Sequence, residues 1–297
     1  MKLNPVYAIK RKIPYTVKVK CKELLHLLRI ASWKKRYSPG FIIIGGQKCG
    51  TSSLYNYLAQ HPQLIASFKK EIHYFDNGLE PCQQNYAKGE RWYRAFFPII
   101  TNRNAIAFEA SPMYCFNPET AQRIYQFNPD IKIIFCIRNP KARAISHYYH
   151  EVKNKREKLP LLEAMETEDV RLQNALQKRD YHDPCFKNFS YKSRGLYAEQ
   201  LKRFLKYFPE NQIHIVCAEE LFAEPQQALE AIYRFVGVDD TFRSTNLRPV
   251  NVSPIKKEVD AATSKHLDDF FQQPNIEFFD LIGRSFNWNQ DFEKITS

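Results

Sequence analysis

A glycine-rich segment, GGQKCGTSS at residues 45–53, has the residue types of a phosphate-binding loop. Gly45 and Gly50 have the G-x-x-x-x-G spacing of a nucleotide-binding loop, but Thr51 stands where that loop has its lysine, and Lys48 comes three residues too early. Backbone N–H groups of such a segment can surround an anion at a helix N-terminus, where the helix dipole also favours negative charge. The segment is therefore either an altered ATP site or an intact site for another phosphate-bearing ligand.

A second anion site is predicted by CIRNP, in which Arg138 ends an apolar segment. Pro140 suits the first turn of a helix, and Ser146 lies about two turns into it. A guanidinium binds phosphate through two parallel hydrogen bonds, and a nearby hydroxyl adds another donor. Two such sites at strand ends indicate a nucleotide phosphorylated at two places. Taken alone, Arg138 could be a structural salt bridge and Ser146 a helix-surface serine.

The segment KEIHYFD, residues 70–76, contains the candidate proton acceptor. In an extended segment Glu71, His73 and Phe75 would point to one face, and the residues between them to the other. A carboxylate and an imidazole near the phosphate loop could accept a proton from an attacking hydroxyl or amine. The alternative is an exposed polar pair on a strand.

A kinase or ATPase would hold Mg²⁺ with an acid at the end of another strand. Two apolar segments do end in acids, AIAFE at Glu109 and IHIVCAEE at Glu219, whereas the one between them ends in Arg138. An arginine there favours a second phosphate group. A P-loop small-molecule kinase stays open as the alternative enzyme class.

The elements that must position these residues alternate along the chain. Short apolar segments rich in Ile and Phe predict buried strands at 41–44, 105–108, 131–137 and 213–217. Helical patterns lie near 51–60, 118–127, 141–152 and 195–207. This alternation predicts an α/β fold, a single domain with a central parallel sheet flanked by helices. Ligands in such folds bind at the carboxyl ends of the strands.

The positive charge is concentrated at the N-terminus. The net charge of the 297 residues is +12, and residues 1–40 hold eleven Lys/Arg against one acid, Glu23, so this segment carries +10 and the remainder +2. We therefore divide the chain into a basic arm, residues 1–39, and a globular domain, residues 40–297. A nucleic-acid partner is not favoured, because no aromatic stacking platform accompanies the charges.

The arm contains a helical pattern, with Leu24, Leu27, Leu28 and Ala31 at helical spacing. A short helix docked on the body with a solvated basic face is one interpretation, and an interfacial helix on anionic lipid is the other. The arm has no apolar run near the roughly 20 residues needed to span a bilayer, and lysines interrupt any signal-peptide core.

Seven cysteines, an odd number at wide spacings without C-x-x-C, argue against a disulfide framework or a zinc site. Their distribution is typical of a reducing compartment. We expect a soluble, cytoplasmic protein.

Taken together, these segments resemble the sulfotransferases that use 3′-phosphoadenosine 5′-phosphosulfate (PAPS), and most of all the heparan sulfate glucosaminyl N- and 3-O-sulfotransferases, as a bacterial-type soluble member. The resemblance covers about residues 40–288. The segments that carry it are GGQKCGTSSLYNYLAQHP, KEIHYFD, FEASPMY, NPDIKIIFCIRNPKARAISHY, SRGLYAEQLKRFLKYFPENQIHIV and PNIEFFDLIGRSFNW.

The resemblance implies a cofactor site. The family's K-x-G-T lysine, which supports the 5′-phosphosulfate, corresponds to Lys48, and the loop donors that follow it correspond to Cys49, Gly50, Thr51 and Ser52. The arginine and serine that hold the 3′-phosphate correspond to Arg138 and Ser146.

It also implies the chemistry. The general base corresponds to Glu71, with His73 beside it in the acceptor cleft. Sulfuryl transfer is an in-line displacement in which negative charge grows on the leaving oxygen, and Lys48 can neutralise that charge. No metal is expected.

The chain also departs from the heparan enzymes. Ala110 replaces the lysine of their E-K-[ST] stretch, and RPVNVSPIKKEVD replaces their lysine-glycine-arginine loop, leaving Lys256, Lys257 or Arg248 as substitutes. The sequence has no counterpart of the cysteine pair that flanks that loop, and we expect no membrane anchor. We therefore expect an acceptor hydroxyl or amine on a saccharide or small polar metabolite, not heparan sulfate itself. A non-catalytic anion-binding scaffold is a third possibility.

Overall fold

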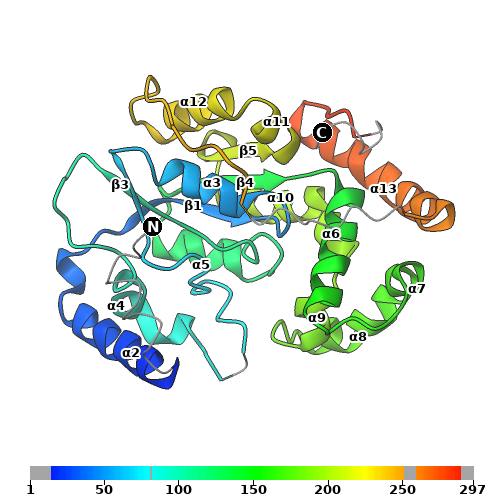
Figure 1. Ribbon diagram of the computed structural model, residues 1–297, viewed down its shortest axis with the longest axis horizontal. Coiled ribbons are helices and arrows are strands. Elements are labelled where there is room, and N and C mark those ends of the chain that lie inside the picture. The colour runs from blue at the N-terminus through cyan, green and yellow to red at the C-terminus, as the bar shows by residue number, and fades with distance from the viewer. Residues whose placement is uncertain (1–14, 81, 251–258, 289–297) are drawn as a thin grey trace, which may run out of the picture.

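A five-stranded sheet forms the centre of the computed structural model, which describes residues 15–80, 82–250 and 259–288, with side chains from residue 23 onward (Figure 1). The strand order is β2-β3-β1-β4-β5, and every pairing is parallel. The strands are β1 (Pro39–Gly45), β2 (Leu64–Ala66), β3 (Ile106–Ala110), β4 (Lys132–Ile137) and β5 (Ile213–Cys217). The predicted α/β fold with a parallel sheet is confirmed, and β2 is the strand that the sequence pattern missed.

Helices cover both faces of the sheet (Figure 1). They are α2 (Tyr15–Ala31), α3 (Thr51–Leu58), α4 (Gly89–Arg94), α5 (Thr120–Phe127), α6 (Pro140–Lys153), α7 (Leu161–Glu166), α8 (Glu168–Lys178), α9 (Pro184–Asn188), α10 (Tyr197–Leu205), α11 (Ala218–Ala223), α12 (Pro225–Val236) and α13 (Ala261–Ile282). The four predicted helices correspond to α3, α5, α6 and α10. None of the described helices is long and apolar enough to cross a bilayer.

The central strands are apolar throughout because both of their faces are buried. On β1, Phe41 and Ile43 pack with α3 and α12, whereas Ile42 and Ile44 pack with α5, α10 and α13. All four side chains are at most 1% exposed. Burying each of them stabilises the fold by about 2 kcal/mol. This rigid sheet fixes the strand ends, from which the loops of the site begin.

The part of the arm that is described packs on the body. The leucine spacing in the arm predicts a helix, and the structure confirms it as α2, which lies against α4. After it, Arg36 and Tyr37 are buried, and they donate hydrogen bonds to the carbonyl oxygens of Phe97 and Asn102. The division of the chain at residues 39/40 stays a prediction, but the last residues of the arm are anchored in the core.

Candidate active site

The glycine-rich segment joins β1 to α3, as predicted. Gly45 has φ +143°, and a Cβ there would collide with Sγ of Cys115 and the carbonyl oxygen of Pro112, so no larger residue fits. Gly50 has φ +77° and precedes α3, whose first residue is Thr51. The backbone therefore turns sharply and presents the first N–H groups of α3 beside Lys48 and Ser52, which are both partly exposed.

Cys49 connects this loop to the next strand end. Its thiol is fully buried 3.7 Å from the hydroxyl of Tyr197, and burial raises the pKa of the thiol to about 11. The Tyr197 hydroxyl in turn donates to the carbonyl oxygen of Arg138 at 2.8 Å. The N–H of Cys49 donates to Gly46 within the loop. A direct contact of Cys49 with a cofactor stays a prediction; the geometry gives its thiol a packing role.

Arg138 lies next to the loop. Its Nη1 donates to the carbonyl oxygen of Lys48 at 3.3 Å, and its Nε is 4.0 Å from Oε1 of Glu219. Asn139 then caps α6, because its side chain accepts from the N–H of Ala142. The two predicted anion sites are thus brought together, and partly exposed Ser146 follows two turns along α6.

Glu219 was considered above as a metal-binding acid of a kinase, but it positions the arginine. Its Oε1 accepts from the N–H of Asn139 at 3.0 Å and faces Arg138, and its Oε2 accepts from the thiol of Cys217 at 3.0 Å. The carboxylate therefore holds the turn after β4 against the turn after β5.

The segment KEIHYFD is not extended. Glu71 and His73 have φ +62° and +57°, which costs an L-residue about 1 kcal/mol each. Two left-handed residues break the alternation, so Phe75 is fully buried with Tyr74 and does not share a face with Glu71 and His73. The prediction for Phe75 was wrong for this reason. Strain of this kind is characteristic of functional sites.

Hydrogen bonds from the end of β3 hold this strained segment. The N–H of Glu71 donates to the carbonyl oxygen of Ala110 at 2.8 Å, and that of Tyr74 to the hydroxyl of Tyr114 at 2.9 Å. Glu109 accepts from the hydroxyls of Tyr114 and two further residues, Ser111 and Tyr93. Its complete burial raises its pKa to about 7. Glu109, the second candidate metal-binding acid, thus anchors the segment that carries Glu71.

Glu71, His73 and Asp76 form a chain of charged groups. Nδ1 of His73 is 2.7 Å from Oδ2 of Asp76, and its Nε2 is 3.8 Å from Oε2 of Glu71. Burial would lower the pKa of His73, but the two carboxylates raise it to about 9. Burial would raise the pKa of Glu71, but His73 and the ammonium of Lys70 lower it to about 2. At neutral pH a protonated His73 therefore lies between two carboxylates.

Lys48 and Glu71 both act electrostatically on His150. The pKa of Lys48 is lowered by burial and by Arg138. The pKa of His150 is lowered by burial and by Lys48, while Glu71 opposes this. His150 was not predicted, although it lies one turn beyond Ser146 on the same face of α6.

Two buried arginines behind the loop were also not predicted. Nη1 of Arg194 donates to Oε1 of Gln47 at 2.5 Å, and burial and neighbouring Arg143 lower the pKa of Arg194 to about 9. Arg143 donates to the carbonyl oxygen of Tyr191, but its Nε and Nη1 are buried without a hydrogen-bond partner. Buried cations on this side of the loop favour an anion on the other.

Lys256 and Lys257 lie outside the described residues. The segment before them reaches the loop, because the N–H of Val250 donates to Oγ of Ser53 in α3 at 2.8 Å. Arg248 is exposed.

The chain is similar to known proteins over most of its length. The family model described as "Sulfotransferase domain" matches residues 38–266. Mouse heparan sulfate glucosamine 3-O-sulfotransferase 5 is 32% identical over 84% of this chain and 74% of its own length. Human bifunctional heparan sulfate N-deacetylase/N-sulfotransferase 2 is 28% identical over 83% of this chain but 30% of its own length.

Among solved structures, a sulfotransferase from Alicyclobacillus acidocaldarius is 31% identical and superposes with a TM-score of 0.69. The superposition covers 86% of this chain and all of that one.

Proposed function

Because this chain belongs to the sulfotransferase family, we propose that it transfers the sulfuryl group of PAPS to a hydroxyl or amine of a saccharide or small polar metabolite. The observation that carries the proposal is the contact between the two anion-binding elements, in which Nη1 of Arg138 donates to the carbonyl oxygen of Lys48 at 3.3 Å. A ligand with two separate phosphate groups matches two adjacent cationic sites. With the family established, the kinase and scaffold alternatives lose their basis.

The residues present fit this donor. The N–H groups of the loop, with Thr51 and Ser52, would hold the 5′-phosphosulfate, and Arg138 with Ser146 the 3′-phosphate. The donor supplies an activated sulfuryl group, which needs no metal for transfer in this proposal. The fit is supported by Arg143, since two of its buried nitrogens have no partner and a nearby anion would stabilise this charge.

Lys48 and Glu71 perform the chemical step in this mechanism. The ammonium of Lys48 stabilises the negative charge that develops on the leaving oxygen. Glu71, ionised at every physiological pH, removes the proton of the acceptor as the new bond to sulfur forms. Nε2 of His73 lies 3.8 Å from this carboxylate and the ammonium of Lys70 contacts it, and both cations keep it ionised.

The relatives are named for heparan sulfate, which makes a saccharide the first acceptor class to test. Ala110 at the end of β3 lacks the cation expected from the heparan enzymes, so a less anionic saccharide is the better candidate. We also propose a cytoplasmic location, since all six cysteines whose side chains are described are free thiols.

Calorimetry with 3′,5′-diphosphoadenosine in the presence of EDTA tests the donor. We expect binding of the nucleotide by the full chain, and loss of most of it in Arg138→Ala. Transfer of radiolabelled sulfate to a panel of saccharides and small hydroxyl and amine compounds then identifies the acceptor. The absence of nucleotide binding would contradict the donor assignment.

A further inference from the structure

Helix α2 turns its apolar side away from the protein. Leu24, Leu25, Leu27 and Leu28 are 59%, 50%, 63% and 63% exposed. The first, third and fourth of these lie on one helical face, and Leu25 borders it. An amphipathic helix on a globular domain normally buries its apolar stripe. In Figure 1 this helix lies at the edge of the molecule.

The polar side of α2 makes the contacts with the body instead. The ring of His26 packs on those of Trp92 and Phe96, with centroids 5.5 and 4.3 Å apart. The guanidinium of Arg29 lies 4.0 Å above the ring of Phe68. The side of α2 that carries His26 and Arg29 therefore faces the aromatic rings of the body. The leucines lie on the opposite side and have no described partner within the domain. Among the described residues, α2 is thus attached to the body by the side opposite its four exposed leucines.

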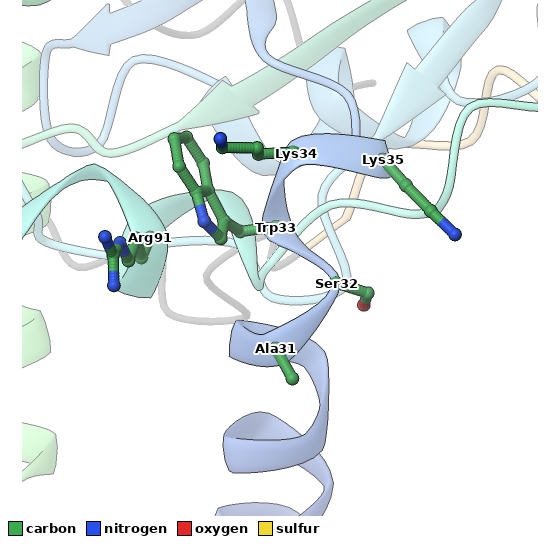
Figure 2. Close-up of a pocket in the computed structure, with 6 residues that line it drawn as sticks. All are labelled: Ala31, Ser32, Trp33, Lys34, Lys35 and Arg91. Carbon is green, nitrogen blue, oxygen red and sulfur yellow. The ribbon is translucent and has the colours of Figure 1, made fainter.

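A basic pocket lies at the end of α2, and Ala31, which continues the helical face of the leucines, is one of its lining residues. It has a volume of about 480 Å³ and begins where α2 ends. Its lining residues, shown in Figure 2, are Ala31, Ser32, Trp33, Lys34, Lys35 and Arg91. The cations of Lys34 and Arg91 both lie 5.8 Å from the indole ring of Trp33. Tryptophan surrounded by cations is typical of protein surfaces at the level of lipid headgroups.

We propose that the leucine face and this pocket form a docking surface for an anionic lipid bilayer. The four leucines enter the boundary of the acyl chains, Trp33 lies at headgroup level, and Lys34, Lys35 and Arg91 contact lipid phosphates. An anionic bilayer complements both the leucines and the cations, because its acyl chains can bury the leucines and its headgroups carry the negative charge.

The charge of the arm argues against the other occupants of this surface. A second copy of the chain would bring another segment of +10 against the first, and the like charges would repel. A nucleic acid would satisfy the cations but would leave the leucines in water.

The docking surface is separate from the catalytic elements. In Figure 1, α2 and α4 lie toward the end of the sheet where β1 begins, whereas α6 and α13 lie at the end where the strands finish. Membrane binding therefore leaves the phosphate loop accessible, and it does not depend on the proposed donor or acceptor.

Flotation of the full chain with vesicles tests the proposal. We expect binding to vesicles of phosphatidylcholine with phosphatidylserine, little binding to phosphatidylcholine alone, and release at high salt. The double variant Leu24→Ser/Leu28→Ser should bind the anionic vesicles about tenfold more weakly. Its matched control is Val170→Ser/Leu176→Ser on α8, where the two side chains are 75% and 50% exposed, and this variant should bind as the unchanged protein does.

Two further variants separate the roles of charge and indole. Lys34→Glu/Lys35→Glu should lose vesicle binding. The control Lys202→Glu/Lys206→Glu, at exposed positions in α10 and at its C-cap, should keep it. A blue shift of tryptophan fluorescence on adding vesicles should be absent in Trp33→Phe. Binding of 3′,5′-diphosphoadenosine should be the same in all these variants, which separates failure of this proposal from failure of the proposed function.

Three results would overturn the proposal. The first is equal vesicle binding by the unchanged protein and Leu24→Ser/Leu28→Ser. The second is a dimer of the unchanged protein, measured by light scattering, that dissociates in the same variant. The third is tight binding to a DNA duplex without binding to anionic vesicles.

Discussion

At the scale of single residues, the candidate base is controlled by its neighbours. Glu71 is partly exposed, with 45% of its side chain accessible, whereas the side chains of His73 and Asp76 are 8% and 1% accessible. The carboxylate of Glu71 is therefore open to an acceptor, while the imidazole beside it is buried. Because protonated His73 and Lys70 lower the pKa of Glu71 to about 2, its carboxylate is ionised at neutral pH and can accept a proton. The same low pKa makes it a weak base in the resting protein.

Glu71→Gln should reduce turnover by about 10²- to 10⁴-fold, because the amide keeps the shape but cannot accept the proton. Affinity for 3′,5′-diphosphoadenosine should not change. Steady-state rates of sulfate transfer and calorimetry measure the two quantities. Glu166→Gln, at an exposed position of α7, is the control and should behave as the unchanged protein does. A parallel loss of nucleotide affinity would mean that Glu71 belongs to the donor site.

Lys48→Ala should slow the chemical step by about 10²- to 10³-fold, since it removes the cation nearest to the leaving oxygen in the proposed mechanism. Single-turnover measurements at saturating donor separate this step from binding. Lys178→Ala, at an exposed position of α8, should have no effect. An unaltered single-turnover rate would exclude Lys48 from the mechanism.

The charged groups of Glu71 and His73 predict how the free energy of unfolding depends on pH. The pKa of His73 is raised from 6.5 to about 9, so the stability it contributes is complete below pH 6.5 and is lost as the pH rises through 9. The pKa of Glu71 is lowered from 4.5 to about 2, so its contribution is complete above pH 4.5 and is lost as the pH falls through 2. The difference in melting temperature between the unchanged protein and His73→Gln should be largest between pH 4.5 and 6.5. A difference that does not shrink above pH 9 would show that His73 is uncharged.

At the scale of elements, hydrogen bonds connect the segments that follow neighbouring strands. β3 ends in Glu109 and Ala110, which anchor the loop of Glu71, and the register pairs Ala110 with Ile43 on β1, two residues before the phosphate loop. On the other side of β1, the turn after β4 is held by Tyr197 and Glu219. The segments that carry Lys48, Glu71 and Arg138 therefore depend on three adjacent strand ends.

Glu109→Gln should destabilise the fold by about 1–3 kcal/mol, because one amide oxygen replaces two carboxylate oxygens that accept three hydroxyl donors. Turnover should fall too, since the segment of Glu71 loses its support. Chemical denaturation and transfer rates measure both effects. Tyr93→Phe removes one of these donors without altering the acid and should have the milder effect. The prediction fails if the activity of Glu109→Gln is normal.

At the scale of the whole molecule, parallel strand order determines which loops meet. The order β2-β3-β1-β4-β5 brings the segments that follow residues 45, 110, 137 and 217 to one edge of the sheet. The arm is attached elsewhere, through Arg36 and Tyr37 and through α2. The candidate active site and the proposed membrane-docking surface thus lie on different parts of the fold.

Two truncations test this division. Removal of residues 1–31 should leave nucleotide affinity nearly unchanged, since the described side chains of the helix it removes contact Phe68, Trp92 and Phe96 and not the glycine-rich segment. Removal of residues 1–38 also deletes buried Arg36 and Tyr37 and should cost a further amount of about 2–4 kcal/mol. Denaturant unfolding compares the two. Equal free energies of unfolding for both truncations would show that Arg36 and Tyr37 do not stabilise the domain.

Much of the fold follows from local patterns, and these are visible in the sequence. The strands with buried faces are apolar throughout, and Gly45, Lys48, Arg138 and Ser146 stand at fixed distances from strand and helix ends. Strand β2, with three residues, is too short to produce such a pattern. Lys256 and Lys257 stay predictions, because their positions are not described.

The sequence by itself therefore determined the α/β class, the glycine-rich turn between β1 and α3, and the strand end that carries Arg138, because each depends on residues close together in the chain. Tertiary structure alone decided the left-handed turns at Glu71 and His73, the carboxylate of Asp76 beside the imidazole, and the roles of Glu109 and Glu219 as anchors. These features depend on contacts between segments that are distant in sequence or on strain supported by such contacts. Tertiary packing also decided that α2 turns its leucines outward, which helical spacing alone could not indicate.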